Sequence, residues 1–177
     1  MALDDTGKPH GRDSQTFEEL FLQEWPRVVG IAQQITRSAA QSEEVAQEAF
    51  LAFYRRFGDA LPDRPAAWLH RAVAHGALNL LRGEGRRRLR EERGTRLEAG
   101  DAPDPGDLMA AQEEILLVRT ALGRLREAEA TVLALRYSGF SYNEIAQATG
   151  LPVSQIGTRL RRAELRLRKE IDYAARR

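Results

Sequence analysis

The segment from Ser141 to Lys169 constrains the fold of this chain more than any other, because it encodes two helices joined by a tight turn. Ser141 and Glu144 form an S-x-x-E capping box, which signals the start of a helix. Gly150 ends that helix, because glycine tolerates the left-handed backbone of a C-cap, and Pro152 sets the first turn of the next one. The segment therefore predicts a short helix followed by a longer one.

The longer helix is both amphipathic and basic. Apolar residues recur at i, i+3 and i+4 spacing and predict one buried stripe: Val153, Ile156, Leu160, Ala163 and Leu167. The other faces carry the cations Arg159, Arg161, Arg162, Arg166, Arg168 and Lys169. Such a pair is typical of a helix-turn-helix unit that reads the DNA major groove. The alternative is an ordinary helical hairpin with a solvated basic face.

Charge is distributed unevenly along the chain, although the whole chain has a net charge of only +1. Residues 1–62 and 99–130 each sum to −4, whereas residues 63–98 sum to +4 and residues 131–177 to +5. Nearly all of the positive charge is arginine, whose planar guanidinium suits phosphates and guanine edges. Two basic blocks separated by acidic ones indicate two nucleic-acid contacts and at least one partner of another kind.

The composition argues against several classes of protein. The chain has 177 residues, of which 42% are apolar, so a packed core is expected rather than global disorder. It has no cysteine, which removes disulfides and thiolate metal sites and fits a reducing cytosol. Apolar runs stay below the ~18 residues of a membrane span, so no membrane insertion is expected. Residues 1–13 lack a signal-peptide core and are expected to form a disordered tail.

Helical patterns account for nearly all of the remaining sequence, and the predicted fold class is all-α. Thr16 with Glu19, and Ser38 with a glutamine three residues later, signal the starts of two helices. Their inward stripes are expected to include Trp25 and Tyr54. Further helices are expected at about 66–81, 108–125 and 128–137. Trp68, in the first of these, is expected in the core, with base stacking as the alternative.

A stretch rich in helix-breaking residues divides the chain. Residues 99–107, AGDAPDPGD, contain two prolines, two glycines and three aspartates, and cannot form a regular element. We therefore expect a flexible acidic linker at residues 97–110. It would join two small helical domains at residues 14–96 and 111–177.

No arrangement of residues in the sequence indicates catalysis. The three histidines, His10, His70 and His75, do not have the spacing of metal ligands. Neither a phosphate-binding glycine loop nor a nucleophile paired with a base is present. The chain is therefore not expected to be an enzyme, and no catalytic residue, metal site or cofactor is expected.

Three motifs, in order, resemble the conserved regions of a bacterial RNA polymerase sigma factor. They are EEVAQEAF (Glu43–Phe50), AAWLHRAVAHGALNLLR (Ala66–Arg82) and the whole of residues 121–171. The resemblance is to the small extracytoplasmic-function (ECF) group of the sigma-70 family. It implies that residues 14–96 are a sigma region 2 domain and residues 111–177 a sigma region 4 domain with a helix-turn-helix.

The resemblance implies core RNA polymerase as a partner, through its β′ clamp helices and its β flap. An acidic helix face would dock on the clamp helices through Glu43, Glu44, Gln47 and Glu48. The linker would thread the polymerase cleft toward the path of RNA exit.

The resemblance also implies promoter DNA as a partner. The helix from Trp68 to Arg88 would melt the downstream (minus-ten) element, with a base flipped out of the stack and held by the loop at residues 58–65. The implied downstream contacts are Asp63, Arg64, Arg71, His75, Asn79, Arg82, Arg86, Arg87 and Arg88. The implied upstream (minus-thirty-five) contacts are Ser154, Gln155, Thr158, Arg159, Arg161 and Arg162.

Several positions depart from the family pattern. His75 and Asn79 stand where the family usually has asparagine and, four residues later, aspartate. Gly157 replaces a usual lysine and costs the helix about 1 kcal/mol relative to alanine. Arg126 replaces a usual proline. The fold tolerates these changes, but the promoter sequence cannot be transferred from the family.

The implied function is an alternative sigma factor that acts in the cytoplasm and is held inactive by an anti-sigma factor. One alternative is a helix-turn-helix regulator that acts without core polymerase, although it would need neither the acidic helix nor the first basic block. A second is a sigma mimic that binds only an anti-sigma factor, for which the changes at His75, Asn79 and Gly157 leave room.

Overall fold

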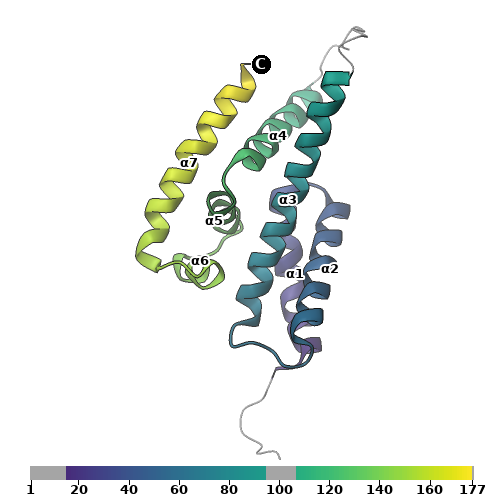
Figure 1. Ribbon diagram of the computed structural model, residues 1–177, viewed down its shortest axis with the longest axis vertical. Coiled ribbons are helices and arrows are strands. Elements are labelled where there is room, and N and C mark those ends of the chain that lie inside the picture. Colours follow the sequence, from purple (N-terminus) through teal and green to yellow (C-terminus); the bar gives the residue numbers. More distant parts are fainter. Residues whose placement is uncertain (1–14, 95–106, 177) are drawn as a thin grey trace, which may run out of the picture.

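A computed structural model describes residues 15–94 and 107–176, which form seven α-helices and no strand (Figure 1). The all-α prediction is confirmed. The helices are α1 (Phe17–Thr36), α2 (Ala39–Phe57), α3 (Pro65–Gly94), α4 (Asp107–Arg124), α5 (Glu127–Tyr137), α6 (Tyr142–Thr149) and α7 (Val153–Ala175).

The N-terminal tail at residues 1–13 and residues 97–106 of the expected linker lie outside the described residues. The last four residues of that linker, 107–110, are helical and belong to α4. The correction has a local cause, because the helix-breaking prolines and glycines of this stretch end at Gly106.

Local capping chemistry sets the helix ends. At the start of α1, Thr16 Oγ1 accepts the Glu19 amide at 3.2 Å, and Glu19 Oε2 accepts the Thr16 amide at 2.9 Å. Ser141 forms the same reciprocal box at α6, which ends at Gly150 with a φ of 73°. Pro152 is the N-cap of α7 rather than its first helical residue, because its ψ of 136° keeps it extended.

Helices α1, α2 and α3 form a three-helix bundle whose interior is rich in aromatic rings. Phe53 is fully buried, and its ring centroid lies between 4.9 and 6.2 Å from those of Phe17, Phe57 and Trp68. Trp68 is partly buried and packs against the core rather than standing free for base stacking. Tyr54 does not lie in the core, since its side chain is 50% exposed, and a phenol at the edge of a core keeps its hydroxyl in water.

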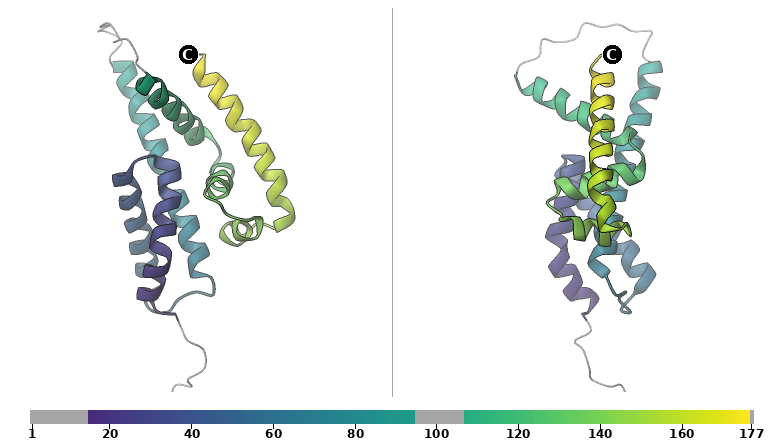
Figure 2. Two further views of the ribbon diagram at one scale, coloured as in Figure 1. Left: turned by 180° about the vertical axis from the view of Figure 1, so that it is seen from behind. Right: turned by 90° about the vertical axis from the view of Figure 1, so that its left-hand side faces the viewer.

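Helices α4 to α7 form the second part of the molecule, with the helix-turn-helix at α6 and α7. The expected stripe of α7 is buried at Ile156, Leu160 and Ala163. Val153 is 46% exposed, because it lies in the first turn of α7, beyond the end of the core. Helices α4, α5 and α6 lie between α7 and the bundle (Figures 1 and 2).

The two parts share one hydrophobic core. A single cluster of buried apolar residues continues from Leu20 in α1 to Ala163 in α7. Helix α3 contacts α4, α5 and α6, and α1 contacts α5. Helix α4 approaches α3 closely at Gly123, where a Cβ atom would lie 3.7 Å from the backbone of Leu81 and Arg82. The bundle and the helix-turn-helix are therefore packed together.

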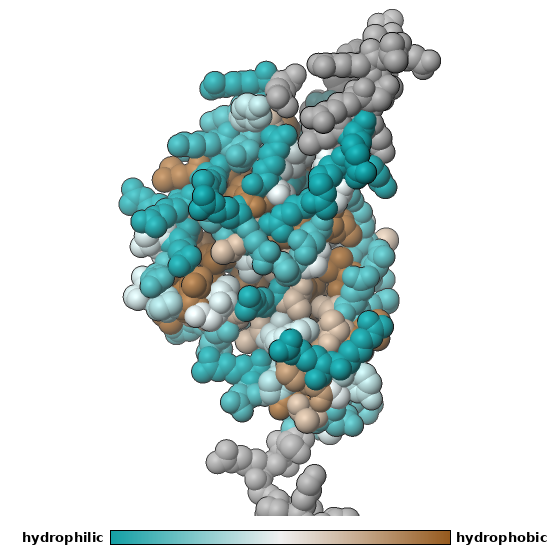
Figure 3. All heavy atoms as spheres, viewed as in Figure 1, coloured by the Kyte–Doolittle hydropathy of each residue, from teal (hydrophilic) through white to brown (hydrophobic). Residues whose placement is uncertain are grey.

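Most of the face seen in Figure 3 is hydrophilic, with smaller hydrophobic patches between the polar side chains. The large apolar side chains that remain exposed include Ile115, Leu116 and Val118 of α4 and Leu165 of α7. Within residues 15–94 and 107–176, no helix is long and apolar enough to cross a membrane.

Candidate nucleic-acid and polymerase interfaces

The four residues expected to dock on polymerase share one face of α2. Glu43 and Gln47 are four residues apart, as are Glu44 and Glu48, so the helix places them in neighbouring rows. All four are exposed, and the apolar residues between them face the interior of the bundle. Helix α2 thus presents an acidic face that a cationic partner can reach.

The nine residues expected to contact the downstream element lie on α3 and on the loop before it. Six are exposed: Asp63, Arg64, Arg71, Asn79, Arg86 and Arg87. Arg88 lies within α3, but its side chain is outside the described part of the structure. The other two, His75 and Arg82, turn toward the second part of the molecule.

His75 and Arg82 contact the start of α5 and the turn before it. His75 Nε2 lies 2.8 Å from Glu127 Oε1, and this nitrogen has essentially no exposed surface. The His75 imidazole lowers the pKa of Glu127. Arg82 donates to Asn79 Oδ1 at 2.9 Å and to the Leu125 carbonyl at 3.4 Å. Two of the expected DNA contacts are therefore engaged within the protein.

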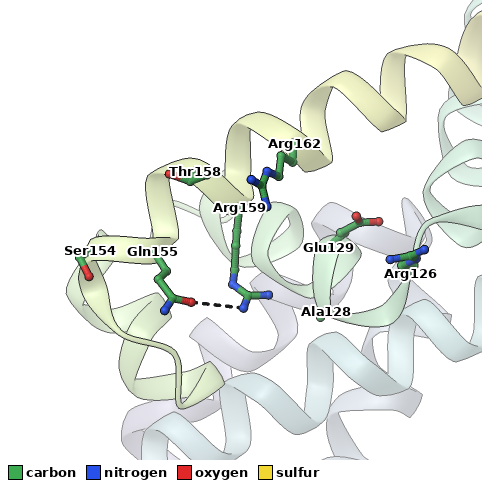
Figure 4. A pocket seen from close by; sticks show the side chains of 8 residues that line it. All are labelled: Arg126, Ala128, Glu129, Ser154, Gln155, Thr158, Arg159 and Arg162. Carbon is green, nitrogen blue, oxygen red and sulfur yellow. Dashed lines mark hydrogen bonds between the residues drawn. The ribbon is translucent and has the colours of Figure 1, made fainter.

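A groove of about 370 Å³ separates the first turns of α7 from the start of α5 (Figure 4). It brings together five of the six expected upstream contacts: Ser154, Gln155, Thr158, Arg159 and Arg162. Arg161 is exposed but does not line the groove. Arg159 Nη2 donates to Gln155 Oε1 at 3.3 Å, as Figure 4 shows. The Gln155 amide oxygen has a second lone pair and its amide nitrogen takes no part in this bond, so the side chain keeps capacity for another partner.

The other wall of the groove is formed by α5 and the residue before it, and the sequence did not single out this wall as part of a site. It contains Arg126, Ala128 and Glu129. Glu129 accepts two hydrogen bonds from Arg166 Nη1, at 2.9 and 3.0 Å, which join α5 to α7. Arg126 could have been noticed in the sequence only because it replaces a proline that is usual in the family. Its guanidinium adds a positive charge beside the groove.

Replacing Gly157 with alanine is expected to stabilise the protein by about 1 kcal/mol, the helix preference of alanine over glycine. A Cβ there would meet only the Tyr142 ring, at 3.5 Å, an ordinary contact. Thermal unfolding measures the gain. Gly76→Ala is the matched control, because its Cβ would lie 3.0 Å from Val45 Cγ1 and the crowding should remove the gain. Equal gains at both positions would contradict this account.

A cluster that the sequence did not reveal joins α1, α3 and the turn before α6. His70 is only 5% exposed, its Nε2 lies 2.7 Å from Glu24 Oε2, and its ring packs edge-on to Phe140 with centroids 4.8 Å apart. The Arg27 guanidinium lies 4.2 Å from the centre of the Phe140 ring and donates to Glu144 Oε1. The cluster therefore connects the bundle to the helix-turn-helix through an aromatic contact, a cation–π contact and an ion pair.

Burial and charge set the protonation of this cluster. Burial lowers the pKa of His70 from 6.5, against the raising effect of Glu24. The neutral imidazole then donates its Nε2 proton to Glu24, because an ionised carboxylate only accepts. The backbone amide of Ser141, followed by the Arg27 guanidinium, lowers the pKa of Glu144 to about 2.

The free energy of unfolding is expected to fall as the pH drops below 6.5. His70, which faces Glu24 and Arg27 of α1 and Glu144 of α6, binds a proton more readily when unfolded, so protonation favours unfolding. Glu144 adds a second loss as the pH falls from 4.5 toward 2. Urea unfolding above and below pH 6.5 measures the first effect. His70→Gln should reduce that pH dependence, and an unchanged slope would contradict the assignment to His70.

Together, a helix-turn-helix with a cationic second helix and a bundle with acidic and basic faces define a two-part, helical DNA-binding protein. The family model for Sigma-70 region 2 matches residues 20–87, and that for Sigma-70, region 4 matches residues 115–167. The chain belongs to the sigma-70 family of RNA polymerase sigma factors, in its ECF group. Members of this family are transcription initiation factors.

Relatives match over most of their length. The RNA polymerase sigma-H factor of Pseudomonas aeruginosa is 30% identical over 172 residues, which cover 92% of this chain and 87% of the relative. The ECF RNA polymerase sigma factor RpoE of Cereibacter sphaeroides is 29% identical over 163 residues, covering 90% and 88%.

Solved structures share the fold of both parts. CnrH, solved in complex with the cytosolic domain of CnrY, aligns with a TM-score of 0.51 and 22% identity over 89% of this chain and 88% of CnrH. The sigma factor RpoE of Bartonella quintana, in complex with the anti-sigma factor NepR, aligns with a TM-score of 0.50 and 22% identity over 88% and 96%. At this identity the likeness concerns the fold alone.

Proposed function

We propose that this sigma factor directs core RNA polymerase to promoters through three separate surfaces. The exposed face of α2 would dock on the β′ clamp helices, α3 and the loop before it would engage the downstream element, and α7 would enter the major groove of the upstream element. The observation that carries this proposal is that acidic and basic faces lie on different helices. A regulator that only bound DNA would have no use for the acidic face of α2.

The two parts of the chain would have different roles in initiation. Residues 14–96 would act as the region 2 domain and residues 111–177 as the region 4 domain, with exposed apolar side chains of α4 available to the β flap. The protein would act in the cytoplasm, where polymerase and chromosome are. It would be an initiation factor and not an enzyme, because RNA synthesis is left to the polymerase.

We also propose an anti-sigma factor as its inhibitor. The two similar structures described above are complexes, CnrH with CnrY and RpoE with the anti-sigma factor NepR. On the bundle of this chain, Leu22 and Leu51 are 68% and 52% exposed and offer such a partner apolar contacts.

Run-off transcription over a fragmented genomic library, with core polymerase and with or without this protein, tests the proposal. The expected result is a set of new transcripts whose templates share an upstream and a downstream element. Binding to core without transcripts would count against initiation on these templates. Tight binding to duplex DNA without polymerase would favour a helix-turn-helix regulator, and an anti-sigma partner without core binding would favour a sigma mimic.

A further inference from the structure

Arginines line both walls of the groove between α7 and the start of α5. Arg159 and Arg162 extend from α7, and Arg126 lies on the opposite wall, at the residue that precedes α5 (Figure 4). Arg126 and Arg162 are exposed, and within the part of the chain that the structure describes neither side chain has a hydrogen bond or an ion pair. Cations that gather across a groove without counter-charges create a positive potential that attracts an anion.

The two carboxylates nearest to Arg126 in sequence have other partners. Glu129 also lines the groove, but it accepts two hydrogen bonds from Arg166, at 2.9 and 3.0 Å. Glu127 Oε1 lies 2.8 Å from His75 Nε2, on α3. Neither carboxylate contacts the Arg126 guanidinium, which therefore stays available to a partner outside the protein.

A groove alongside a DNA-reading helix lies where a strand of the DNA runs. The major groove is about 12 Å wide, and an α-helix with its side chains fills about 10–12 Å of it. The two sugar-phosphate strands that border the major groove must therefore pass along the sides of an inserted helix. On one side of α7 that space is the groove, whose opposite wall carries Arg126. Arg126 is thus placed to meet a phosphate rather than a base edge.

We propose that Arg126 binds a phosphate of the upstream element, opposite Arg162, so that one DNA strand is contacted from both walls of the groove. The inference rests on the proposed role of α7 at that element. Arginine suits the contact because its planar guanidinium can donate two parallel hydrogen bonds to phosphate oxygens. Such a contact fixes the position of the protein on DNA but carries no sequence information. Since the family usually has proline at this position, the contact belongs to this chain rather than to the family.

The salt dependence of binding measures how many phosphates the protein neutralises. For duplex DNA the logarithm of the association constant falls with the logarithm of the salt concentration, with a slope of about 0.9 per phosphate contact. We expect Arg126→Ala to weaken binding of the full chain to a pool of short duplexes of random sequence about tenfold, and to reduce that slope by about 0.9. Arg126→Lys keeps the charge and should retain most of the slope.

Arg168→Ala is the matched control, because Arg168 is exposed on α7 outside the groove and its loss changes the net charge equally. It should leave the slope unchanged. The Arg126 side chain does not cap α5, so its replacement should leave thermal unfolding unchanged. Sequencing of the bound and unbound DNA should give the same base preference for the wild type and Arg126→Ala. A wild-type slope in Arg126→Ala, equal losses in both alanine variants, or an altered base preference would overturn the proposal.

Arginine modification gives a second test that needs no variant. Phenylglyoxal reacts with exposed guanidinium groups, and peptide mass spectrometry gives the rate at each site. We expect the duplex pool to slow the reaction of Arg126 and Arg162 and to leave that of Arg168 unchanged. Equal rates at Arg126 with and without DNA, or a wild-type chain that binds no DNA, would overturn the proposal. Transcription is measured separately, so protection of Arg126 without transcripts would count against the proposed function alone.

Discussion

Reversing the charges of Glu44 and Glu48 together (E44R/E48R) should lower the affinity for core RNA polymerase about 100-fold, because like charges across an interface cost several kcal/mol and each 1.4 kcal/mol is tenfold. Both residues are exposed on α2, so the change should leave the fold intact. Binding of labelled protein to core polymerase measures the effect, and run-off transcription should fall with it.

The matched control separates the docking surface from overall charge. Glu18→Arg with Asp172→Arg makes the same change in net charge at exposed positions of α1 and α7. This variant should bind core polymerase nearly as well as the wild type. Equal losses in both double variants would show that long-range charge, rather than the face of α2, governs docking.

Replacing Phe140 with alanine should lower the free energy of unfolding by about 3–5 kcal/mol, the usual cost of truncating a buried phenylalanine. Phe140 is fully buried, and its ring contacts His70 and Arg27 from the other part of the molecule. Because small domains are stable by only about 5–15 kcal/mol, this loss is a large fraction of the total. Urea unfolding measures it.

Tyr137 is the matched control for Phe140, since it is an aromatic residue of the same turn region with 65% exposure. Tyr137→Ala should change stability by less than about 0.5 kcal/mol, as is usual for surface positions. A similar loss in both variants would mean that the turn itself, rather than the buried ring, is responsible.

Local signals in the sequence predicted the helices well. The capping boxes at Thr16 and Ser141 and the C-cap at Gly150 form as expected, because each depends on side chains within three or four residues of the helix end. The predicted stripe of α7 is exposed at Val153 and only partly buried at Leu167, since periodicity indicates a face but not where the core beneath it ends.

Contacts between distant segments could not be predicted in the same way. Nothing near His70 indicates that Glu24, Arg27 and Phe140 will surround it, because the pairing depends on how the two parts pack. His75 and Arg82 were expected to face DNA, yet both are engaged with α5 and the turn before it. The roles of the exposed site residues on α2, α3 and α7 remain predictions that the proposed variants test.

The shared hydrophobic core has a consequence for how long the protein survives in a cell. Residues 15–94 and 107–176 form units of about 80 and 70 residues, and units this small bury a smaller fraction of their surface than the combined molecule does. Separation exposes apolar side chains that the packed form protects, and it increases local unfolding, which proteases exploit. A variant whose two parts separate is therefore expected to be degraded faster, so the packing of the two parts also affects the lifetime of the protein.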